Sequence, residues 1–182
     1  MTFISDSLNR IKPSATMVIT AKATQLKREG KKVIGLSSGE PDFDTPQHVK
    51  QAAIDAINSG YTKYTNIEGI PELRQSIVEK FKKDNDLNYD VSNVIVGTGG
   101  KQILFNALMS SLNKDDEVII PAPYWVSYPD MTLLAGGKPI FVDCSSETNF
   151  KLTGEALDKV ITKNSKWLIL NSPSNPTGSC YS

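Results

Sequence analysis

Residues 94–108 read VIVGTGGKQILFNAL and join an apolar run, a glycine-rich turn and an amphipathic segment without interruption. The run Val94–Val96 does not alternate apolar with polar residues, which is typical of a strand buried on both faces. After the glycines, Leu104 and Leu108 recur at helical spacing. A strand that leads through a tight turn into a helix indicates a parallel sheet with helices packed against it.

The same order of apolar run and helical segment repeats toward the C-terminus. Helices are expected at residues 126–135 and 152–161. Further strands are expected at Val118–Ile120, where Pro121 stops the strand, at Pro139–Val142 and at Trp167–Leu170. This alternation predicts an α/β fold with a mostly parallel sheet and flanking helices. In such sheets, ligands bind beyond the carboxyl ends of the strands.

Toward the N-terminus, the sequence predicts helices joined by loops. A helix is expected over Ser14–Arg28, and a short strand-like run follows at Val33–Leu36. Thr45 and Pro46 favour the N-cap and the first position of a second helix. A third helix is expected from about Pro71. We therefore expect an N-terminal arm to join the α/β domain near Thr45.

The composition excludes several classes of protein. The 182 residues carry 20 Lys+Arg against 20 Asp+Glu, whereas nucleic-acid binders normally carry a basic excess. One histidine and two cysteines are too few for a His-rich metal site or a disulfide framework. No run approaches the roughly 20 apolar residues of a membrane span, and the first residues lack the layout of a secretory signal. We expect a cytoplasmic protein that handles small molecules and binds neither nucleic acid nor membrane.

The glycine-rich turn Gly97–Gln102 is the first candidate site. Free N–H groups at the start of the following helix, together with the helix dipole, suit a phosphate group at residues 99–101. Ile95 and Gln102 stand where a P-loop requires glycine and serine or threonine, so the turn is not a P-loop. The alternative is a tight turn that needs glycine only for its backbone.

Two further candidates follow expected strand ends. Trp125, with Tyr124 before it, offers a flat face to a planar ring, although a lone tryptophan is also common in a core or an interface. Asn175 stands between Pro173 and Pro176, which would hold its amide in one place as a hydrogen-bond donor and acceptor. The alternative for Asn175 is a proline- and glycine-rich loop without a ligand.

Gly39, Lys12 and Tyr64 are weaker candidates when each is taken singly. Gly39 would let the backbone approach a ligand, but it also fits a linker turn. Lys12 fits a solvated charge, and Tyr64 fits an interface. His48 lies just after a helix start, where we expect it to face solvent without a role.

Six segments are more specific together than any of them is alone. They are SGEPDF (38–43), KY (63–64), GIPELR (69–74), GGKQ (99–102), PAPYWVSY (121–128) and NSPSNPTG (171–178). In this order they closely resemble the class I aminotransferases, which depend on pyridoxal 5′-phosphate, and the resemblance covers essentially the whole chain. The nearest branch is that of the bacterial aspartate aminotransferases, which often also accept prephenate. The resemblance implies the fold type I of pyridoxal-phosphate-dependent transferases.

The resemblance also implies how matching residues would bind the cofactor. The backbone of the glycine-rich turn would hold the phosphate, and Trp125 would stack on the pyridine ring. The Asn175 amide would donate to the phenolic oxygen of the ring, and Tyr64 would reach the phosphate of the partner subunit in a homodimer. The cofactor-binding residues implied are Gly99, Gly100, Lys101, Trp125, Asn175 and Tyr64.

The substrate residues follow from the same resemblance. The backbone at Gly39, with Trp125 and Asn175, would line the α-carboxylate of the amino acid. Lys101 and Lys12 would bind the second carboxylate of aspartate or glutamate, and Lys12 in particular would bind prephenate; lysine suits this task as a compact point charge. The expected substrates are therefore acidic amino acids and 2-oxo acids.

These implications define the expected function. The chain resembles an aspartate aminotransferase that converts L-aspartate and 2-oxoglutarate to oxaloacetate and L-glutamate by ping-pong transamination, with aspartate or glutamate–prephenate transamination as a related activity. Residues 1–44 would form an arm and the start of a small domain, and residues 45–182 the N-terminal part of the large cofactor-binding domain. The Schiff-base lysine would lie beyond Ser182, so the chain looks like a fragment. We expect the isolated chain to be inactive.

Other interpretations stay open on the sequence. The chain could be a non-enzymatic binding module or an inactive, truncated remnant with the same fold. It could be an aminotransferase specific for aromatic amino acids or alanine. The glycine-rich turn by itself also fits an unrelated nucleotide-binding α/β protein.

Overall fold

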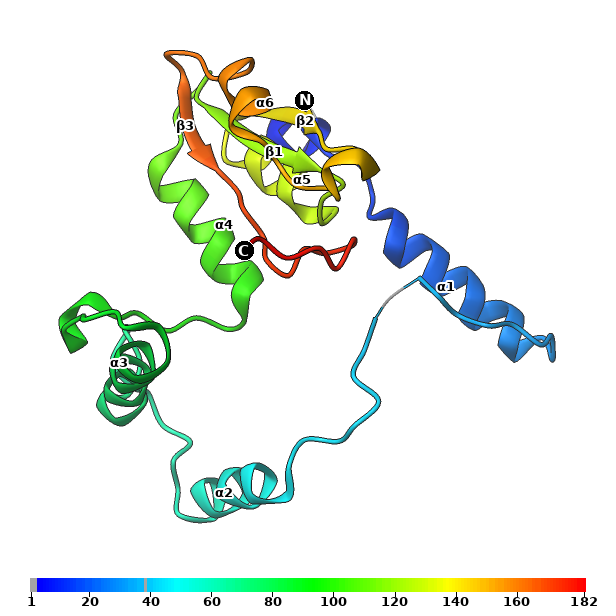
Figure 1. Cartoon of the computed structure of the whole chain (residues 1–182). Coiled ribbons are helices and arrows are strands. Elements are labelled where there is room, and N and C mark those ends of the chain that lie inside the picture. Colours follow the sequence, from blue (N-terminus) through cyan, green and yellow to red (C-terminus); the bar gives the residue numbers. More distant parts are fainter. Residues whose placement is uncertain (1–2, 38) are drawn as a thin grey trace. The chain divides into compact units, whose positions relative to one another are not determined.

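The computed structural model describes residues 3–37 and 39–182, so Ser38 of the SGEPDF segment lies outside the described residues. The chain divides into two compact units. The first contains the residues up to Val18 together with Lys101–Ser182, and the second contains Ile19–Gly100. Figure 1 shows the elements of both units. The domain boundary expected near Thr45 stays a prediction.

The first unit is built on a three-stranded parallel sheet (Figure 1). Strand β1 (Glu117–Ala122) lies in the middle, between β2 (Lys138–Asp143) and β3 (Ser165–Leu168). Both neighbours run parallel to β1. Parallel strands need a crossover connection, and the segments between these strands contain helices. The predicted α/β fold with a parallel sheet is thus confirmed.

Strand β1 is buried on both faces, since Val118, Ile119 and Ile120 each expose 2% or less of their surface. Such burial is what the unbroken apolar run predicts. Pro121 does not end the strand as expected, because pairing with β2 continues to Ala122. The pairing with β3 ends at Ile119, and Pro121 has no N–H with which to extend the ladder on that side.

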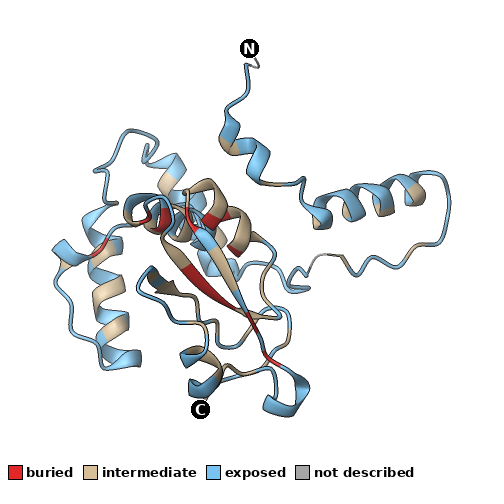
Figure 2. Ribbon diagram, turned by 90° about the horizontal axis from the view of Figure 1, so that it is seen from above, coloured by how far each residue is buried: buried red, intermediate tan, exposed pale blue. Residues whose placement is uncertain are grey.

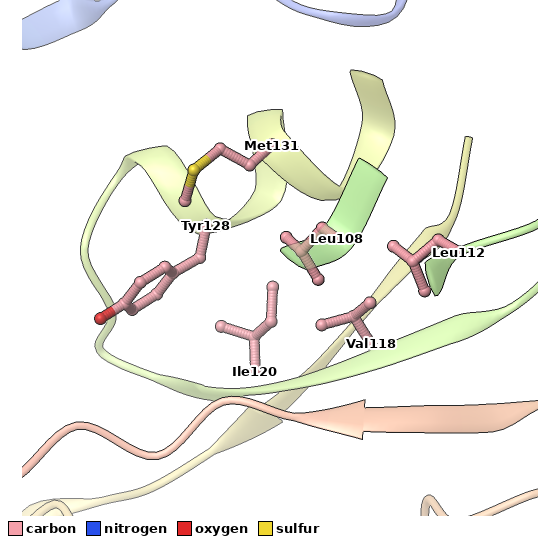
Figure 3. Packing of buried hydrophobic residues seen from close by; sticks show 6 residues of the cluster. All are labelled: Leu108, Leu112, Val118, Ile120, Tyr128 and Met131. Carbon is pink, nitrogen blue, oxygen red and sulfur yellow. The ribbon is translucent and has the colours of Figure 1, made fainter. Parts of the chain in front are cut away.

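The core of the first unit lies on the face of β1 that α4 (Gly100–Ser111) and α5 (Ser127–Leu134) cover. Figure 3 shows side chains from the two helices, and from the residue after α4, converging on two residues of β1. The six buried members are Leu108, Leu112, Val118, Ile120, Tyr128 and Met131. Full burial of one such side chain stabilises a fold by roughly 1.5–3 kcal/mol, so this cluster holds both helices to the sheet.

Three short helical segments also belong to the first unit. They are η1 (Asp6–Arg10), η3 (Ser146–Thr148) and α6 (Gly154–Asp158). The segment η1 packs against α5, where the Arg10 guanidinium donates to the Leu133 carbonyl at 3.3 Å. Helix α6 is shorter than the helix expected over residues 152–161. It starts at Gly154, because Thr153 caps it by accepting from the Ala156 N–H at 3.2 Å, and it already ends at Asp158.

The second unit buries little surface, and its helices are mostly exposed in Figure 2. It holds most of α1 (Ala15–Arg28), and α2 (Gln47–Asn58), α3 (Pro71–Asn85) and η2 (Val91–Asn93). Val94, at 9% exposed, is the one buried residue among those described here. Arg74 of α3 holds the segment around Val94 in place, because its guanidinium donates to the Val91 and Val94 carbonyls at 2.6 and 3.0 Å. The second unit is therefore held by local polar contacts more than by a core.

Two expected strands are wrong in this unit. Val33–Leu36 and Val94–Val96 form no strand in the described chain. A strand needs a partner for its backbone groups, and Val96 instead donates its N–H to the Glu68 carbonyl at 2.9 Å. Gly69 lies beside this contact with φ +104°, and a Cβ there would come within 2.9 Å of Val96 Cγ2. The loop before α3 therefore takes the place of a neighbouring strand.

The helix starts agree with the sequence only in part. Helix α3 begins at Pro71, as expected. Helix α2 begins at Gln47, with Pro46 rather than Thr45 at the N-cap and no side-chain hydrogen bond to the cap. The prediction that Thr45 caps this helix is wrong, because a prolyl residue in extended conformation already occupies the position before the first helical residue.

Candidate functional site

The carboxyl ends of β1 and β3 separate and leave a cavity between them. The final backbone bond of this pairing runs from the Ile169 N–H to the Ile119 carbonyl at 3.0 Å. The cavity beyond it encloses about 20 Å³, room for one water-sized molecule. Residues that line it include Pro121, Tyr124, Tyr128, Asn171, Asn175 and Tyr181. A proline that stops strand pairing thus opens space at the edge where parallel sheets bind ligands.

Aromatic rings cover one side of this edge. The Tyr124 ring stacks on Phe141 of β2, with 5.0 Å between ring centroids and 16° between ring planes. The half-buried Trp125 indole meets the Tyr128 ring edge-on, at 5.4 Å and 88°. In Figure 3 the Tyr128 hydroxyl points away from Leu108. Burial raises the pKa of this hydroxyl, so Tyr128 stays neutral at physiological pH.

The N-terminus of α4 brings backbone donors and a cation to the same edge. The helix has 12 residues and begins at Gly100. Gly99 before it has φ +81°, and a Cβ added at Gly99 or Gly100 would meet nothing within 4 Å. The Lys101 ammonium lies 4.8 Å from the centroid of the Trp125 ring. The first backbone N–H groups of α4, its positive helix end and the Lys101 ammonium together suit an anion. The Gly99 N–H is not among these donors, because it bonds to the Gly97 carbonyl at 3.0 Å.

The NSPSNPTG segment forms a closed loop at the carboxyl end of β3. The Asn171 side-chain oxygen accepts from the Asn175 N–H at 2.8 Å, and the Ser174 carbonyl accepts from the Gly178 N–H at 2.7 Å. The Ser172 hydroxyl accepts from the Tyr181 N–H at 3.0 Å. These bonds shape the loop while leaving the Asn175 side chain exposed at the edge of the sheet.

The structure brings some of the predicted residues together. Lys101 contacts Trp125, and Trp125 contacts Tyr128, which lines the same cavity as Asn175. Lys12 is exposed in the first unit and takes no part in these contacts. Gly39 and Tyr64 belong to the second unit, where both are exposed.

Sequence reasoning missed two residues of this edge. Tyr128 has no role predicted from the sequence, yet it lines the cavity together with Tyr124, which the sequence places in the aromatic face beside Trp125. Asn171 had no assigned role, yet its side chain holds Asn175. The signal that could have found Asn171 is its position as the first polar residue after an apolar strand run.

The rest of the described chain holds neither a cluster of metal ligands nor a helix that could cross a membrane. Among the described residues, no three His, Cys, Asp or Glu side chains gather as a metal site would require. No helix in that part of the chain has the length and apolar character needed to cross a membrane. Burial raises the pKa of the Cys144 thiol, which makes it a poor nucleophile, and His48 is exposed as expected.

The donor set at the sheet edge fits a flat ring that carries a phosphate. Trp125 supplies an aromatic face, Asn175 an amide, and the start of α4 supplies backbone donors with space above them. The 20 Å³ cavity itself is too small for such a ring, so the ring would lie outside it, over Trp125. These features match pyridoxal phosphate in shape and charge.

Comparison with known proteins identifies a family. The model of the family "Aminotransferase class I and II" matches residues 31–182. A protein of Rickettsia bellii named "Probable aspartate/prephenate aminotransferase" is 60% identical over 182 residues, which are 100% of this chain and 46% of that protein. The chain therefore spans less than half the length of this relative.

Solved structures give the same result. The aspartate aminotransferase of Rhizobium meliloti superposes with a TM-score of 0.95 at 51% identity, over 100% of this chain and 46% of that one. The aspartate aminotransferase of Thermus thermophilus, solved with maleate, superposes with a TM-score of 0.96 at 46% identity, over 100% of this chain and 48% of that one. The fold type I architecture is thus confirmed for the part of the enzyme that this chain covers.

Proposed function

Because the chain belongs to the class I and II aminotransferase family, we propose that it takes part in pyridoxal-phosphate-dependent transamination of acidic amino acids. The proposed reaction transfers the amino group of L-aspartate to 2-oxoglutarate and gives oxaloacetate and L-glutamate; prephenate is a further amino acceptor. The family match carries this proposal. The name of the Rickettsia relative and the maleate in the Thermus structure, a dicarboxylate, support the substrate class.

The proposed cofactor contacts are those that the family resemblance implies, and the chemistry of the edge supports them. The backbone of Gly99–Lys101 holds the phosphate, whose charge the positive end of α4 favours. Gly100 and Lys101 supply the N–H donors, since the Gly99 N–H already bonds to the Gly97 carbonyl. Trp125 covers one face of the ring and keeps water from it. The Asn175 amide donates to the phenolic oxygen. When bound, the cofactor withdraws electrons from the amino acid and so acidifies its α-proton.

The proposed substrate contacts use cations and backbone. Lys101 and Lys12 attract the second carboxylate of aspartate or glutamate, since lysine is a compact charge that suits a single carboxylate. Gly39, with Trp125 and Asn175, lines the α-carboxylate. A homodimer in which Tyr64 reaches the phosphate of the partner's site completes the proposal. The exposed ring of Tyr64 supports an interface role.

Cofactor binding can be tested on the chain itself. Pyridoxamine 5′-phosphate is a suitable probe, because its amino group does not react with surface lysines. Its binding is followed by quenching of Trp125 and Trp167 fluorescence, with the Trp125→Phe variant to assign the signal. We expect saturable quenching that inorganic phosphate reverses in competition. Saturable binding of a nucleotide with no effect of the pyridoxamine probe would contradict the proposal.

The reaction is tested with a chimaera. This chain replaces the corresponding 46% of the Rhizobium meliloti aspartate aminotransferase, and oxaloacetate formation from aspartate and 2-oxoglutarate is measured. We expect turnover that falls at least tenfold in Lys101→Ala and Lys12→Ala with aspartate, and by much less with alanine. A folded chimaera that binds cofactor but prefers aromatic amino acids or alanine would overturn the substrate proposal.

A further inference from the structure

Asn171 lies where the sheet ends and the loop of Asn175 begins. Ile169, two residues earlier, makes the final described backbone bond to β1, through the Ile119 carbonyl at 3.0 Å. Asn171 is half-buried against the cavity. It is therefore tied to the most buried strand of the molecule by a connection of two residues.

The Asn171 side chain contacts the loop residue Asn175, which follows it in the chain. Its oxygen accepts from the Asn175 N–H at 2.8 Å. The loop's other bonds close it upon itself, from the Ser174 N–H to the Ser179 carbonyl and from the Gly178 N–H to the Ser174 carbonyl, at 2.9 and 2.7 Å. Among the described hydrogen bonds, the one from Asn171 is the link that runs from the end of the sheet to Asn175.

We propose that Asn171 is a positioning residue: it holds Asn175 in the place from which the Asn175 amide meets the cofactor ring. Pro176 restricts the backbone of Asn175 on its C-terminal side, and Asn171 holds it on its N-terminal side. The backbone of Asn175 is thus restricted from both sides. The hydrogen bond between the two asparagines is seen in the structure itself. The contact of Asn175 with a cofactor ring rests on the proposed function.

The substitutions separate positioning from direct contact. Asn171→Ala removes the acceptor oxygen, whereas Asn171→Asp keeps an acceptor, loses the amide donor and adds a negative charge. A residue that positions Asn175 through its oxygen is rescued by aspartate, and a residue that donates its own amide to the ligand is not. Ser172→Ala is the matched control, because it also removes a side-chain acceptor of a loop N–H, that of Tyr181, without touching Asn175.

The first measurement is amide hydrogen exchange by NMR on the whole chain without ligand. We expect Asn171→Ala to speed exchange of the Asn175 N–H by roughly fivefold, the factor for loss of one ordinary hydrogen bond. Asn171→Asp should leave it near the wild-type rate. Ser172→Ala should speed exchange at Tyr181 and not at Asn175. If the exchange rate of the Asn175 N–H is unchanged in Asn171→Ala, the hydrogen bond between the two asparagines does not hold the loop. This conclusion does not depend on whether the chain binds a cofactor.

The second measurement is the affinity for pyridoxamine 5′-phosphate by tryptophan fluorescence. We expect Asn171→Ala to weaken binding about fivefold and to add nothing in an Asn175→Ala background. Full additivity of the two alanine substitutions would overturn the positioning role. If the wild-type chain does not bind the probe, the proposed function fails on this chain while the exchange experiment still decides the link.

Discussion

The two ends of the same sheet are built from different chemistry. At the amino ends of the strands, Asp115 pairs with Lys138 and Asp116 with Lys166, each at 2.9 Å. Glu117 accepts from the Thr162 hydroxyl at 2.6 Å. These groups are satisfied by one another.

The carboxyl ends carry rings, prolines and amides instead. Trp125, Asn175 and the start of α4 present an aromatic face, an amide and backbone donors at this edge. Polar groups that a fold does not use for itself are available for a ligand. The carboxyl ends are therefore the expected binding site. Substitutions at the amino ends of the strands should change stability, and those at the carboxyl ends should change ligand binding.

The largest expected effect comes from the strand that connects the two ends. Ile120 is fully buried between them, so Ile120→Ala should lower the free energy of unfolding by about 2–5 kcal/mol and weaken both ends together. Urea denaturation measures the change. Ile34→Ala is the matched control, since Ile34 is 87% exposed and should change stability by less than about 0.5 kcal/mol. Equal losses in the two variants would mean that β1 does not join the two ends.

A smaller loss is expected from crowding the amino end. A Cβ on Gly137 would lie 3.0 Å from Leu112 Cδ1 and 3.1 Å from the Asp116 carbonyl oxygen. Gly137→Ala should therefore cost about 1–3 kcal/mol of unfolding free energy without weakening the binding of pyridoxamine 5′-phosphate to the folded protein. Gly154→Ala, where a Cβ meets nothing within 4 Å, should be neutral or slightly stabilising in the same denaturation experiment. A neutral Gly137→Ala would contradict the tight packing at this end.

The charges of the amino end predict an acid dependence. The hydrogen bond from Lys138 lowers the pKa of Asp115, and bonds from the Asn113 N–H and Lys166 lower that of Asp116. Because the folded pKa values lie below the unfolded ones, the contribution to stability is complete above the unfolded pKa near 3.9 and is lost as pH falls through the folded values.

Denaturation midpoints between pH 7 and pH 2 test this dependence. We expect Asp116→Asn to flatten the acid loss of stability relative to wild type, while Asp42→Asn, at an exposed loop position, should leave the slope unchanged. The same slope in all three proteins would show that the lowered pKa values at the amino end do not contribute. The effect should be small, since both pairs are open to solvent and screened by salt.

The smallest effect on stability should come from the carboxyl end. Asn175→Ala removes an exposed amide but keeps the backbone N–H that bonds to Asn171, so the free energy of unfolding should change by less than about 0.5 kcal/mol. The affinity for pyridoxamine 5′-phosphate should fall severalfold in the fluorescence titration. Asp116→Asn, the matched change at the other end, should leave that affinity unchanged at pH 7. A loss of affinity in Asp116→Asn with none in Asn175→Ala would contradict the proposed difference between the two ends.

Much of the first unit could be predicted from the sequence because its signals are local and strong. The run Val118–Ile120 is apolar at every position, and only burial on both faces accommodates such a strand. Helix α4 starts at the glycines because they allow the positive φ of Gly99. The C-terminal end of β1 is harder to predict from the sequence, because Pro121 blocks pairing on one side of the strand and not on the other.

The prediction of strands in the second unit is wrong for a different reason. Val94–Val96 has the composition of a strand, yet a strand exists only where another backbone pairs with it. Here Arg74 and the loop at Glu68 take up the backbone groups of this run instead. A sequence window reports the apolar character of a segment and carries no information on which distant segment lies beside it.

The order of residues along the chain by itself determined the α/β class, the parallel sheet and the family, because these depend on repeated local patterns and on motifs in a set order. Only the tertiary structure decided that β1 lies between β2 and β3, that their amino ends hold charge pairs, and that Asn171 reaches Asn175. Those features depend on distances between segments far apart in the chain or on the path of a loop, and both are settled only when the chain is packed.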